Sequence, residues 1–240
     1  MPQKFKTILA NFSYVIASNL LTVLVSSLVV LLLPKIMGAK EYGYWQLYIF
    51  YLSYVGFIHL GWVDGIYLRY GGLEYQRLDK EKFFSQFLML TAYLVSVSLF
   101  LLAGIFFFIK DTDSRFIFML LTYTMMVTNV RYLFIYILQM TNRLKESSYV
   151  VSGDRFLYLL LLVLLICLGF RNFKIMVYAD LVGRIMSLLY AMYLCRDIVL
   201  HPLNKFQLNI NEMVTNIGVG INLMLSNVAS LTIQQLCQPL

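Results

Sequence analysis

Residues 157–168 read LYLLLLVLLICL, a run without a single charged side chain. Apolar and polar residues do not alternate in it, as they do in the strands of a membrane β-barrel. Instead, apolar side chains would cover every side of a helix. A backbone in lipid must satisfy its hydrogen bonds within one segment, which an α-helix does. The run therefore predicts a membrane-crossing helix and excludes a barrel strand.

The rest of the chain has the same character. Of its 240 residues, 60% are hydrophobic and 13% are charged, whereas soluble domains average about half and about a quarter. The mean hydropathy is +0.76. This composition excludes a disordered protein, a secreted disulfide-stabilised domain and a soluble enzyme with one buried core. A helical membrane protein is the class that remains.

Seven stretches reach or approach the length of about 20 apolar residues that a helix needs to cross ~30 Å of hydrocarbon. The first ends at Pro34 and is too long for the core of a signal peptide. We expect an all-α, polytopic helical membrane protein with a six-helix lobe (1–205) and a partial seventh helix that opens a second lobe (206–240). The expected helices cover residues 8–33, 42–62, 83–109, 116–140, 150–170 and 175–195, and then 213–234.

The positions of Lys and Arg predict the orientation, because cytoplasmic loops are enriched in both. With the N-terminus inside, eleven of the nineteen basic residues lie on the inner side and six on the outer side, while Arg131 and Arg184 fall within spans. The inner count includes Arg155, which we expect, with Asp154, at the inner end of the fifth span. This bias explains most of the net charge of +7. Nucleic-acid binding is not indicated, because basic and aromatic residues are not interleaved on a polar patch.

The two arginines within spans are the first candidates for a binding site. Arg131 lies roughly 13 Å from the inner end of its helix, and Arg184 follows Asp180 by one turn near the middle of the sixth span. A charge at the bilayer centre costs at least ~2.5 kcal/mol, so these side chains should face other helices or a water-filled cavity. The pair Asp180 and Arg184 either locks helix packing or orients the arginine. Guanidinium groups in a cavity suit a phosphate-bearing substrate.

The second predicted span supplies further candidates. Tyr48 and Tyr51 lie on one helix face with Tyr44, at i, i+4 and i+7, where phenols either line a sugar path or pack at the membrane interface. Asp64 and Arg69 follow toward the inner end of this span.

Glycines lie beside these charges. Gly61 and Gly65 have the GxxxG spacing that is typical of close helix contact.

Signatures of enzymes and metal sites are absent from the sequence. It contains no GxSxG, HExxH or DxD motif, and the predicted loops are too short for a catalytic domain. Cys167, Cys195 and Cys237 include no CxxC pair, and the two histidines are far apart in sequence. We therefore expect neither an enzyme, nor a metal, nor a cofactor.

Two segments resemble the N-terminal part of bacterial polysaccharide flippases, which belong to the multidrug/oligosaccharidyl-lipid/polysaccharide exporter superfamily. The first opens with NFSY (11–14), runs through the proline-containing loop LPKIMG (33–38) and continues as EYGYWQLY (41–48). The second is GFIHLGWVDGIYLRYG (56–71). The likeness is strongest over residues 8–82, and beyond them only the rhythm of hydropathy is shared.

The resemblance implies a transporter that carries oligosaccharides linked to undecaprenyl pyrophosphate across the bacterial plasma membrane. In that family, two lobes with twelve to fourteen helices in total surround a cationic cavity. Movement of one lobe against the other opens the cavity to each side of the membrane in turn. On this hypothesis Arg131, Arg184 and Arg69 receive the pyrophosphate, and Asp180 and Asp64 orient them. The expected partners are the lipid-linked oligosaccharide, membrane lipids, and either a missing C-terminal half or a second copy. The last expectation follows from the tail 234–240, which neither continues the helix nor supplies a basic stop.

Three alternatives stay open. A drug or metabolite exporter of the same superfamily would favour buried carboxylates for ion coupling, whereas the deep charges here are mainly arginines. A membrane enzyme of glycan assembly would carry a long outer loop, and the predicted outer loops 35–41, 110–115 and 171–174 are short. An inactive truncated fragment is the third.

Overall fold

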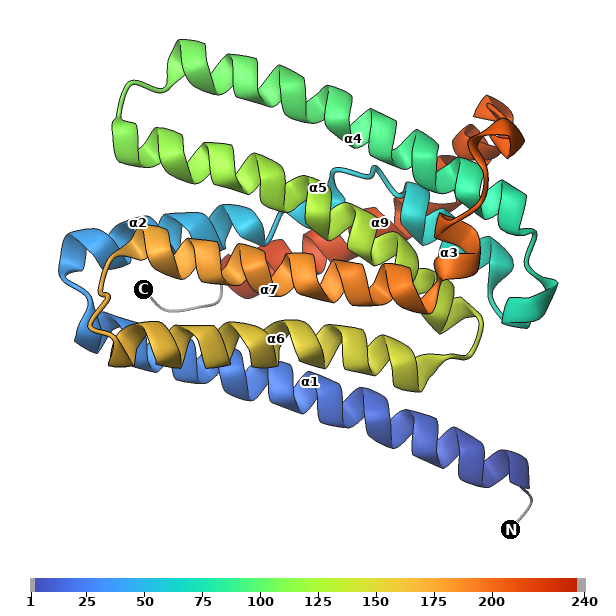
Figure 1. Ribbon diagram of the computed structural model, residues 1–240, viewed down its shortest axis with the longest axis horizontal. Helices are drawn as coiled ribbons and strands as arrows, with labels where there is room; N and C mark the ends of the chain where they lie inside the picture. The colour runs from blue at the N-terminus through green and yellow to red at the C-terminus, as the bar shows by residue number, and fades with distance from the viewer. Residues whose placement is uncertain (1–2, 237–240) are drawn as a thin grey trace.

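The structure is a computed structural model that describes residues 3–236, so Cys237 and the rest of the tail, 237–240, lie outside the described residues. The described chain folds into helices joined by short turns and contains no strand (Figure 1). The expected all-α class is confirmed. The helices are α1 (Gln3–Ile36), α2 (Ala39–Leu52), η1 (Val55–Phe57), α3 (Trp62–Tyr70), η2 (Tyr75–Arg77), α4 (Lys80–Phe108), α5 (Thr112–Met140), α6 (Leu144–Cys167), α7 (Phe173–Leu194), α8 (Arg196–Val199), η3 (Leu203–Lys205) and α9 (Ile210–Leu236).

Six of the described helices, α1, α4, α5, α6, α7 and α9, are long and apolar enough to cross a membrane. A seventh span results if α2 with η1 and α3 are counted as one bent pair, whose two parts meet at 50°. At the bend Leu60 and Gly61 have positive φ angles of 54° and 80°, a conformation that Gly61 adopts at low cost because it has no Cβ. The continuous helix expected over 42–62 is therefore wrong, because regular α-helix ends at Leu52 and resumes at Trp62.

Other helix boundaries also differ from the expected ones, among them the end of α1 and the start of α6. Helix α1 continues through Pro34 to Ile36, because a proline so close to the end removes only one late hydrogen bond. Helix α6 begins at Leu144 and not at about residue 150, because its polar first half packs inside the bundle. Asp154 and Arg155 therefore lie in the middle of a spanning helix. The expected position of this pair at the end of a span is therefore wrong, and without Arg155 the expected inner count falls from eleven basic residues to ten.

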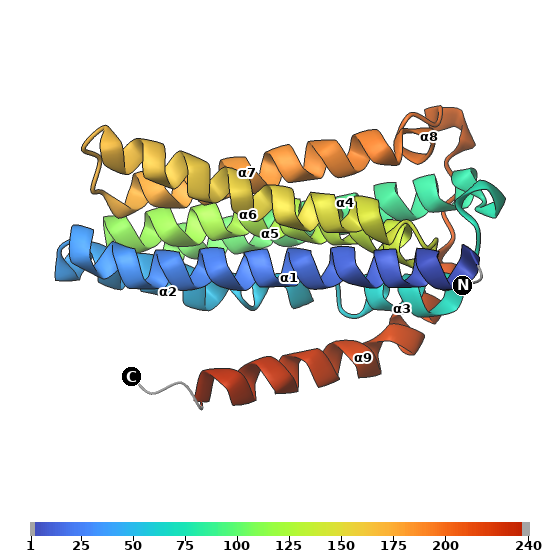
Figure 2. The ribbon, with the colours of Figure 1, turned by 90° about the horizontal axis from the view of Figure 1, so that it is seen from below.

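Helix α5 is the centre of the bundle, since 61% of its most apolar segment is buried, compared with 17% in α1 and in α9. Helices α4, α7 and α2 pack around α5, and α6 lies between α7 and α1 (Figure 1). Seen from the side, α9 forms a layer of its own along one face of the bundle (Figure 2). The bundle therefore has a packed centre and two largely uncovered helices, α1 and α9.

Helix α9 joins the bundle mainly through α3, where the two backbones touch. A Cβ atom on Gly65 would lie 1.8 Å from the carbonyl oxygen of Asn216, and one on Gly220 would lie 2.0 Å from the carbonyl oxygen of Gly61. Such distances are open only to glycine, which is why small residues mark close helix contacts in membranes. The contact predicted from the spacing of Gly61 and Gly65 is confirmed.

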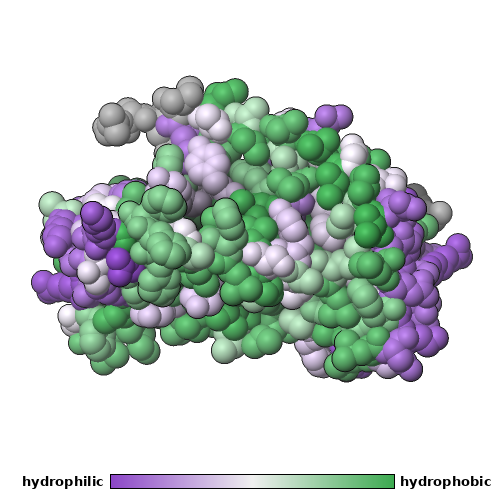
Figure 3. Space-filling model, turned by 90° about the horizontal axis from the view of Figure 1, so that it is seen from above, coloured by the Kyte–Doolittle hydropathy of each residue, from purple (hydrophilic) through white to green (hydrophobic). Residues whose placement is uncertain are grey.

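The surface agrees with a position in a lipid bilayer. Hydrophobic residues cover the middle of the molecule, and hydrophilic residues gather at its two ends (Figure 3). Large apolar side chains such as Phe100 of α4 are exposed, by 77% in this case, and hydrocarbon would cover them. The chain is a polytopic helical membrane protein.

Candidate functional site

Helices α5, α6 and α7 hold two buried ion pairs within their spanning segments. Arg131 of α5 donates to Oδ2 of Asp154 on α6 over 2.7 Å, and the Nε of Arg184 donates to Oδ2 of Asp180 over 2.6 Å, both on α7. None of these four side chains is more than 5% exposed. Breaking such a pair leaves an uncompensated buried charge, at a cost of about 3–5 kcal/mol. The first pair therefore joins α5 to α6, whereas the second lies within α7.

A fifth charged side chain, Arg155 of α6, connects the two pairs. Its Nη2 lies 3.3 Å from Oδ2 of Asp154, and its Nη1 lies 3.4 Å from Oδ1 of Asp180. Its side chain is 20% exposed, against 5% for the other two arginines. We call these five side chains, Arg131, Asp154, Arg155, Asp180 and Arg184, the arginine cluster. With three guanidinium groups and two carboxylates, its formal charge is +1.

Hydroxyl groups surround the arginine cluster. Tyr48 of α2 donates to Oδ2 of Asp180 over 2.8 Å, while Thr128 accepts from Arg184 over 3.4 Å. Ser187 accepts from Arg131 over 3.1 Å and donates to a backbone carbonyl of α6. Because Tyr48 is fully buried, its phenol holds α2 against α7 and has no free surface toward a cavity.

Three polar atoms in or beside the arginine cluster form no hydrogen bond with the described residues. They are Nε of Arg131, Oδ1 of Asp154 and the hydroxyl oxygen of Tyr158. Buried polar atoms of folded proteins nearly always find a partner. The cluster therefore has hydrogen-bonding capacity left for water or for a ligand.

A cavity of about 630 Å³ adjoins the arginine cluster. Arg155 and Arg184 line it, whereas Arg131 is not among the lining residues. A volume of this size is typical of ligand-binding pockets, which range over about 300–1,000 Å³. The other lining residues come from α1, α2, α5, α6, α9 and the segment after α2, and are Thr22, Val25, Ser26, Val29, Val30, Trp45, Ile49, Leu52, Ser53, Gly56, Thr128, Tyr132, Tyr158 and Leu231.

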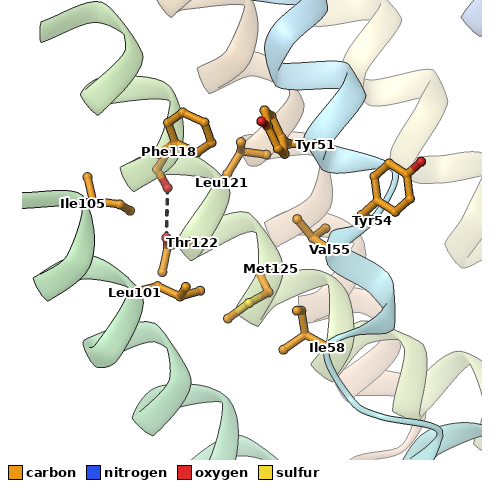
Figure 4. Close-up of a pocket in the computed structure, with 10 residues that line it drawn as sticks. All are labelled: Tyr51, Tyr54, Val55, Ile58, Leu101, Ile105, Phe118, Leu121, Thr122 and Met125. Atoms are coloured by element: carbon orange, nitrogen blue, oxygen red, sulfur yellow. Dashed lines mark hydrogen bonds between the residues drawn. The ribbon is translucent and has the colours of Figure 1, made fainter. Parts of the chain in front are cut away.

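The opposite side of the α2–η1 segment borders a second, apolar depression of about 240 Å³ (Figure 4). Tyr51 lines this groove and not the cavity, together with side chains from α4 and α5. Thr122, the most polar residue of the α5 wall, donates its hydroxyl proton to the carbonyl of Phe118 over 2.9 Å. The groove has no charged lining residue, so its surface suits hydrocarbon and not an anion.

The structure brings together four of the predicted site residues, Arg131, Arg184, Asp180 and Tyr48. Tyr51, in the apolar groove, is separated from them by α2. Asp154 and Arg155, the remaining members of the arginine cluster, are not among the residues that the sequence indicates. Arg131 itself could have indicated them. A buried arginine without an acidic neighbour on its own helix needs a carboxylate from another helix.

Arg69 and Asp64 have other partners than the sequence suggests. Arg69 donates to Glu212 at the start of α9 over 2.7 Å, and Lys82 of α4 lies 3.1 Å from the same carboxylate. Asp64 lies 3.7 Å from His59. The expected orientation of an arginine by Asp64 is not seen among the described residues, because Asp64 and Arg69 are five positions apart and point about 140° away from each other around α3.

No family model, curated protein or solved structure matches this chain. The chemistry of the arginine cluster is therefore the available guide to function. Guanidinium groups bind phosphate and carboxylate groups through paired, charge-assisted hydrogen bonds. Among residues 3–236, no three His, Cys, Asp or Glu side chains lie together as metal ligands. An anion is the ligand that this arrangement fits.

Proposed function

We propose that the chain is a transporter, or one lobe of a transporter, that moves a phosphate-bearing, lipid-linked oligosaccharide across the bacterial plasma membrane. One observation carries the proposal, the surplus guanidinium group of Arg155. It lies in the middle of the spanning helix α6, touches both carboxylates of the arginine cluster, and is partly exposed in the cavity.

Helix packing alone does not account for Arg155. The pairs Arg131–Asp154 and Arg184–Asp180 already balance each other. A third arginine adds a positive charge at a depth where a charge costs at least ~2.5 kcal/mol. A pyrophosphate group in the cavity would offset that cost, and a neutral sugar would not.

The charge of the cavity also favours an anionic substrate over a cationic drug. The lining includes two arginines, Arg155 and Arg184, and no Asp or Glu. The two arginines would repel a cation in this cavity, and specific binding sites use such repulsion to exclude the wrong ligand.

The partner and the orientation are part of the proposal. In the family that the sequence resembles, a cationic cavity lies between two lobes. Here α1 and α9 flank the cavity and are the least buried spans. We expect a second helical lobe, or a second copy of the chain, to pack against them, with the N-terminus of α1 in the cytoplasm.

Cysteine accessibility tests whether the cavity holds water. Ser26 lines the cavity about 15 Å from the end of α1, whereas the neighbouring Ser27 is exposed but does not line it. In a background without native cysteines, a charged thiosulfonate should label the Ser26→Cys variant and leave Ser27→Cys unlabelled in liposomes. Equal labelling of both variants, or labelling of neither, would contradict an aqueous cavity at this depth.

A second experiment tests the ligand. Undecaprenyl pyrophosphate added to the liposomes should slow labelling of Ser26→Cys severalfold, and undecaprenol, which has the same chain without phosphate, should not. The double variant Ser26→Cys with Arg155→Gln should be labelled at the same rate with and without undecaprenyl pyrophosphate. If the alcohol protects as well as the pyrophosphate, the cavity recognises the hydrocarbon chain and the proposal fails.

A further inference from the structure

Asp64 is a buried carboxylate outside the arginine cluster. It lies in the first turn of α3, directly after the bend, and is 1% exposed. Its Oδ1 accepts a long hydrogen bond of 3.5 Å from the hydroxyl of Tyr136 on α5. Its Oδ2 accepts no hydrogen bond from the described residues and lies 3.7 Å from Nε2 of His59. That distance is too long for a hydrogen bond.

The geometry around His59 shows why it does not act as a counter-cation for Asp64. The backbone N–H of Gly61 donates to Nδ1 of His59 over 3.1 Å, so the lone pair of Nδ1 is occupied. A neutral imidazole with one occupied acceptor nitrogen carries its proton on the other, which here is Nε2, the atom that faces Asp64. Protonating Nδ1 as well would set two N–H groups against each other. A proton that enters this pair must therefore bind the carboxylate.

The other elements packed against α3 bring no free cation to Asp64. The ring of Tyr136 of α5, whose hydroxyl reaches Asp64, lies 5.1 Å from the ring of Tyr67 of α3 at a tilt of 43°. On α9 the nearest carboxylate, Glu212, is held by Arg69 and by Lys82 of α4. Within the described chain, no Lys or Arg lies within ion-pair distance of Asp64.

Asp64 thus differs from the other two buried aspartates. Asp154 lies 2.7 Å from Arg131 and 3.3 Å from Arg155, and Asp180 lies 2.6 Å from Arg184 and 3.4 Å from Arg155. Two guanidinium groups thus lie within ion-pair distance of each of these carboxylates. Asp64 is as deeply buried and has only a phenol and a neutral imidazole.

We propose that Asp64 is a proton-binding site, whose carboxylate takes up one proton from water and releases it again while His59 stays neutral. Uptake converts a charged carboxylate into a neutral carboxylic acid beside the α3–α9 contact, where Gly65 touches Asn216. This site is distinct from the arginine cluster, and its occupation by a proton does not depend on which substrate the cavity binds.

Infrared difference spectroscopy tests the proposal on the purified full chain in nanodiscs. Lowering the pH from about 8 to about 5 leaves water-exposed carboxylates largely ionised, because they titrate near pH 4. The wild-type protein should develop a carbonyl band of a buried carboxylic acid that shifts in heavy water. Asp64→Asn should remove this band, and the matched variants Asp154→Asn and Asp180→Asn should keep it.

The same measurement can overturn the proposal. A band that survives Asp64→Asn, or no band in the wild-type protein, excludes Asp64 as the proton-binding site. If Asp64→Asn does not fold, the variant His59→Gln tests the proposal instead. It replaces the neutral neighbour of Asp64 and retains the carboxylate. The pH midpoint of the band should then move, and an unchanged midpoint would place the proton elsewhere. Neither result depends on transport.

Discussion

Removing a carboxylate from the arginine cluster should destabilise the protein far more than removing Arg155. Asp154→Asn leaves three guanidinium groups facing one carboxylate and takes the 2.7 Å partner from Arg131. The expected loss in unfolding free energy is about 3–5 kcal/mol, the cost of an uncompensated buried charge. Arg155→Gln leaves two balanced pairs and removes contacts of 3.3 and 3.4 Å made by a partly exposed side chain. We expect a change within about 1 kcal/mol.

Thermal unfolding of the purified chain in detergent measures the difference, with the buried Trp45 and Trp62 as fluorescent probes. For a chain of this size, 1 kcal/mol corresponds to about 2–4 °C. Asp154→Asn should thus lower the melting temperature by about 6–20 °C, and Arg155→Gln by less than about 4 °C. The exposed Glu74→Gln provides the control for loss of a negative charge.

Equal destabilisation by the two variants would refute this reasoning. Arg155 would then be a structural member of the packed core, and the cluster would have no surplus charge to offer to a ligand. The double variant Arg131→Gln with Asp154→Asn sharpens the test. Because it removes both members of one pair, it should recover most of the stability lost in Asp154→Asn.

Three further predictions concern other parts of the chain. Gly65→Ala places a methyl group 1.8 Å from a backbone oxygen of α9 and should cost about 1–3 kcal/mol in thermal unfolding, whereas Gly104→Ala, with open space around it, should not destabilise. Burial raises the pKa of Cys195 to about 11. In a variant that keeps Cys195 as its only cysteine, this thiol should react with an aqueous maleimide at pH 8 about a hundredfold more slowly than a peptide thiol, and the rate should rise about tenfold for each pH unit up to about 11. A rate that reaches a plateau near pH 9 would contradict this. Cysteines replacing Lys110 and Lys145 should be labelled from opposite sides of sealed vesicles, with position 145 on the cytoplasmic side, and labelling from one side only would exclude the topology.

The spanning helices could be predicted from the sequence because lipid is a uniform solvent. Helices such as α1 and α4 expose apolar side chains on most sides, and hydropathy detects this without knowledge of their neighbours. The bend between α2 and α3 could not be predicted in the same way. Apolar residues continue through it, and the positive φ angle of Leu60 has no counterpart in composition. Gly61 was the one visible sign, and its spacing indicated only a helix contact.

The arginine cluster was predictable only where its contacts are local. Asp180 and Arg184 lie one turn apart on α7, and the sequence shows that spacing directly. The contact between Arg131 and Asp154 depends on how α5 packs against α6, which no pattern within one helix specifies. The sequence placed Asp154 and Arg155 at the end of a span, as a gate pair or an interfacial cap, because the apolar run begins at Phe156. Helix α6 begins twelve residues earlier, at Leu144, and so carries both residues in its middle.

Helix α9 connects the two proposed sites, the cavity beside the arginine cluster and Asp64. Near its start, Asn216 touches Gly65, the neighbour of Asp64. Near its end, Leu231 lines the cavity, and Gln235 bonds with the hydroxyl groups of Ser53 and Tyr54 after α2. A helix of 27 residues is about 40 Å long, so a small tilt at the glycine contact moves its far end by several ångströms. If a proton on Asp64 alters this tilt, it changes the affinity of the cavity for an anion. Because linkage between two ligands is reciprocal, a bound anion then changes the affinity of Asp64 for the proton by the same factor. Asp64 and Arg155 need no direct contact for such coupling, because one rigid helix touches the surroundings of both.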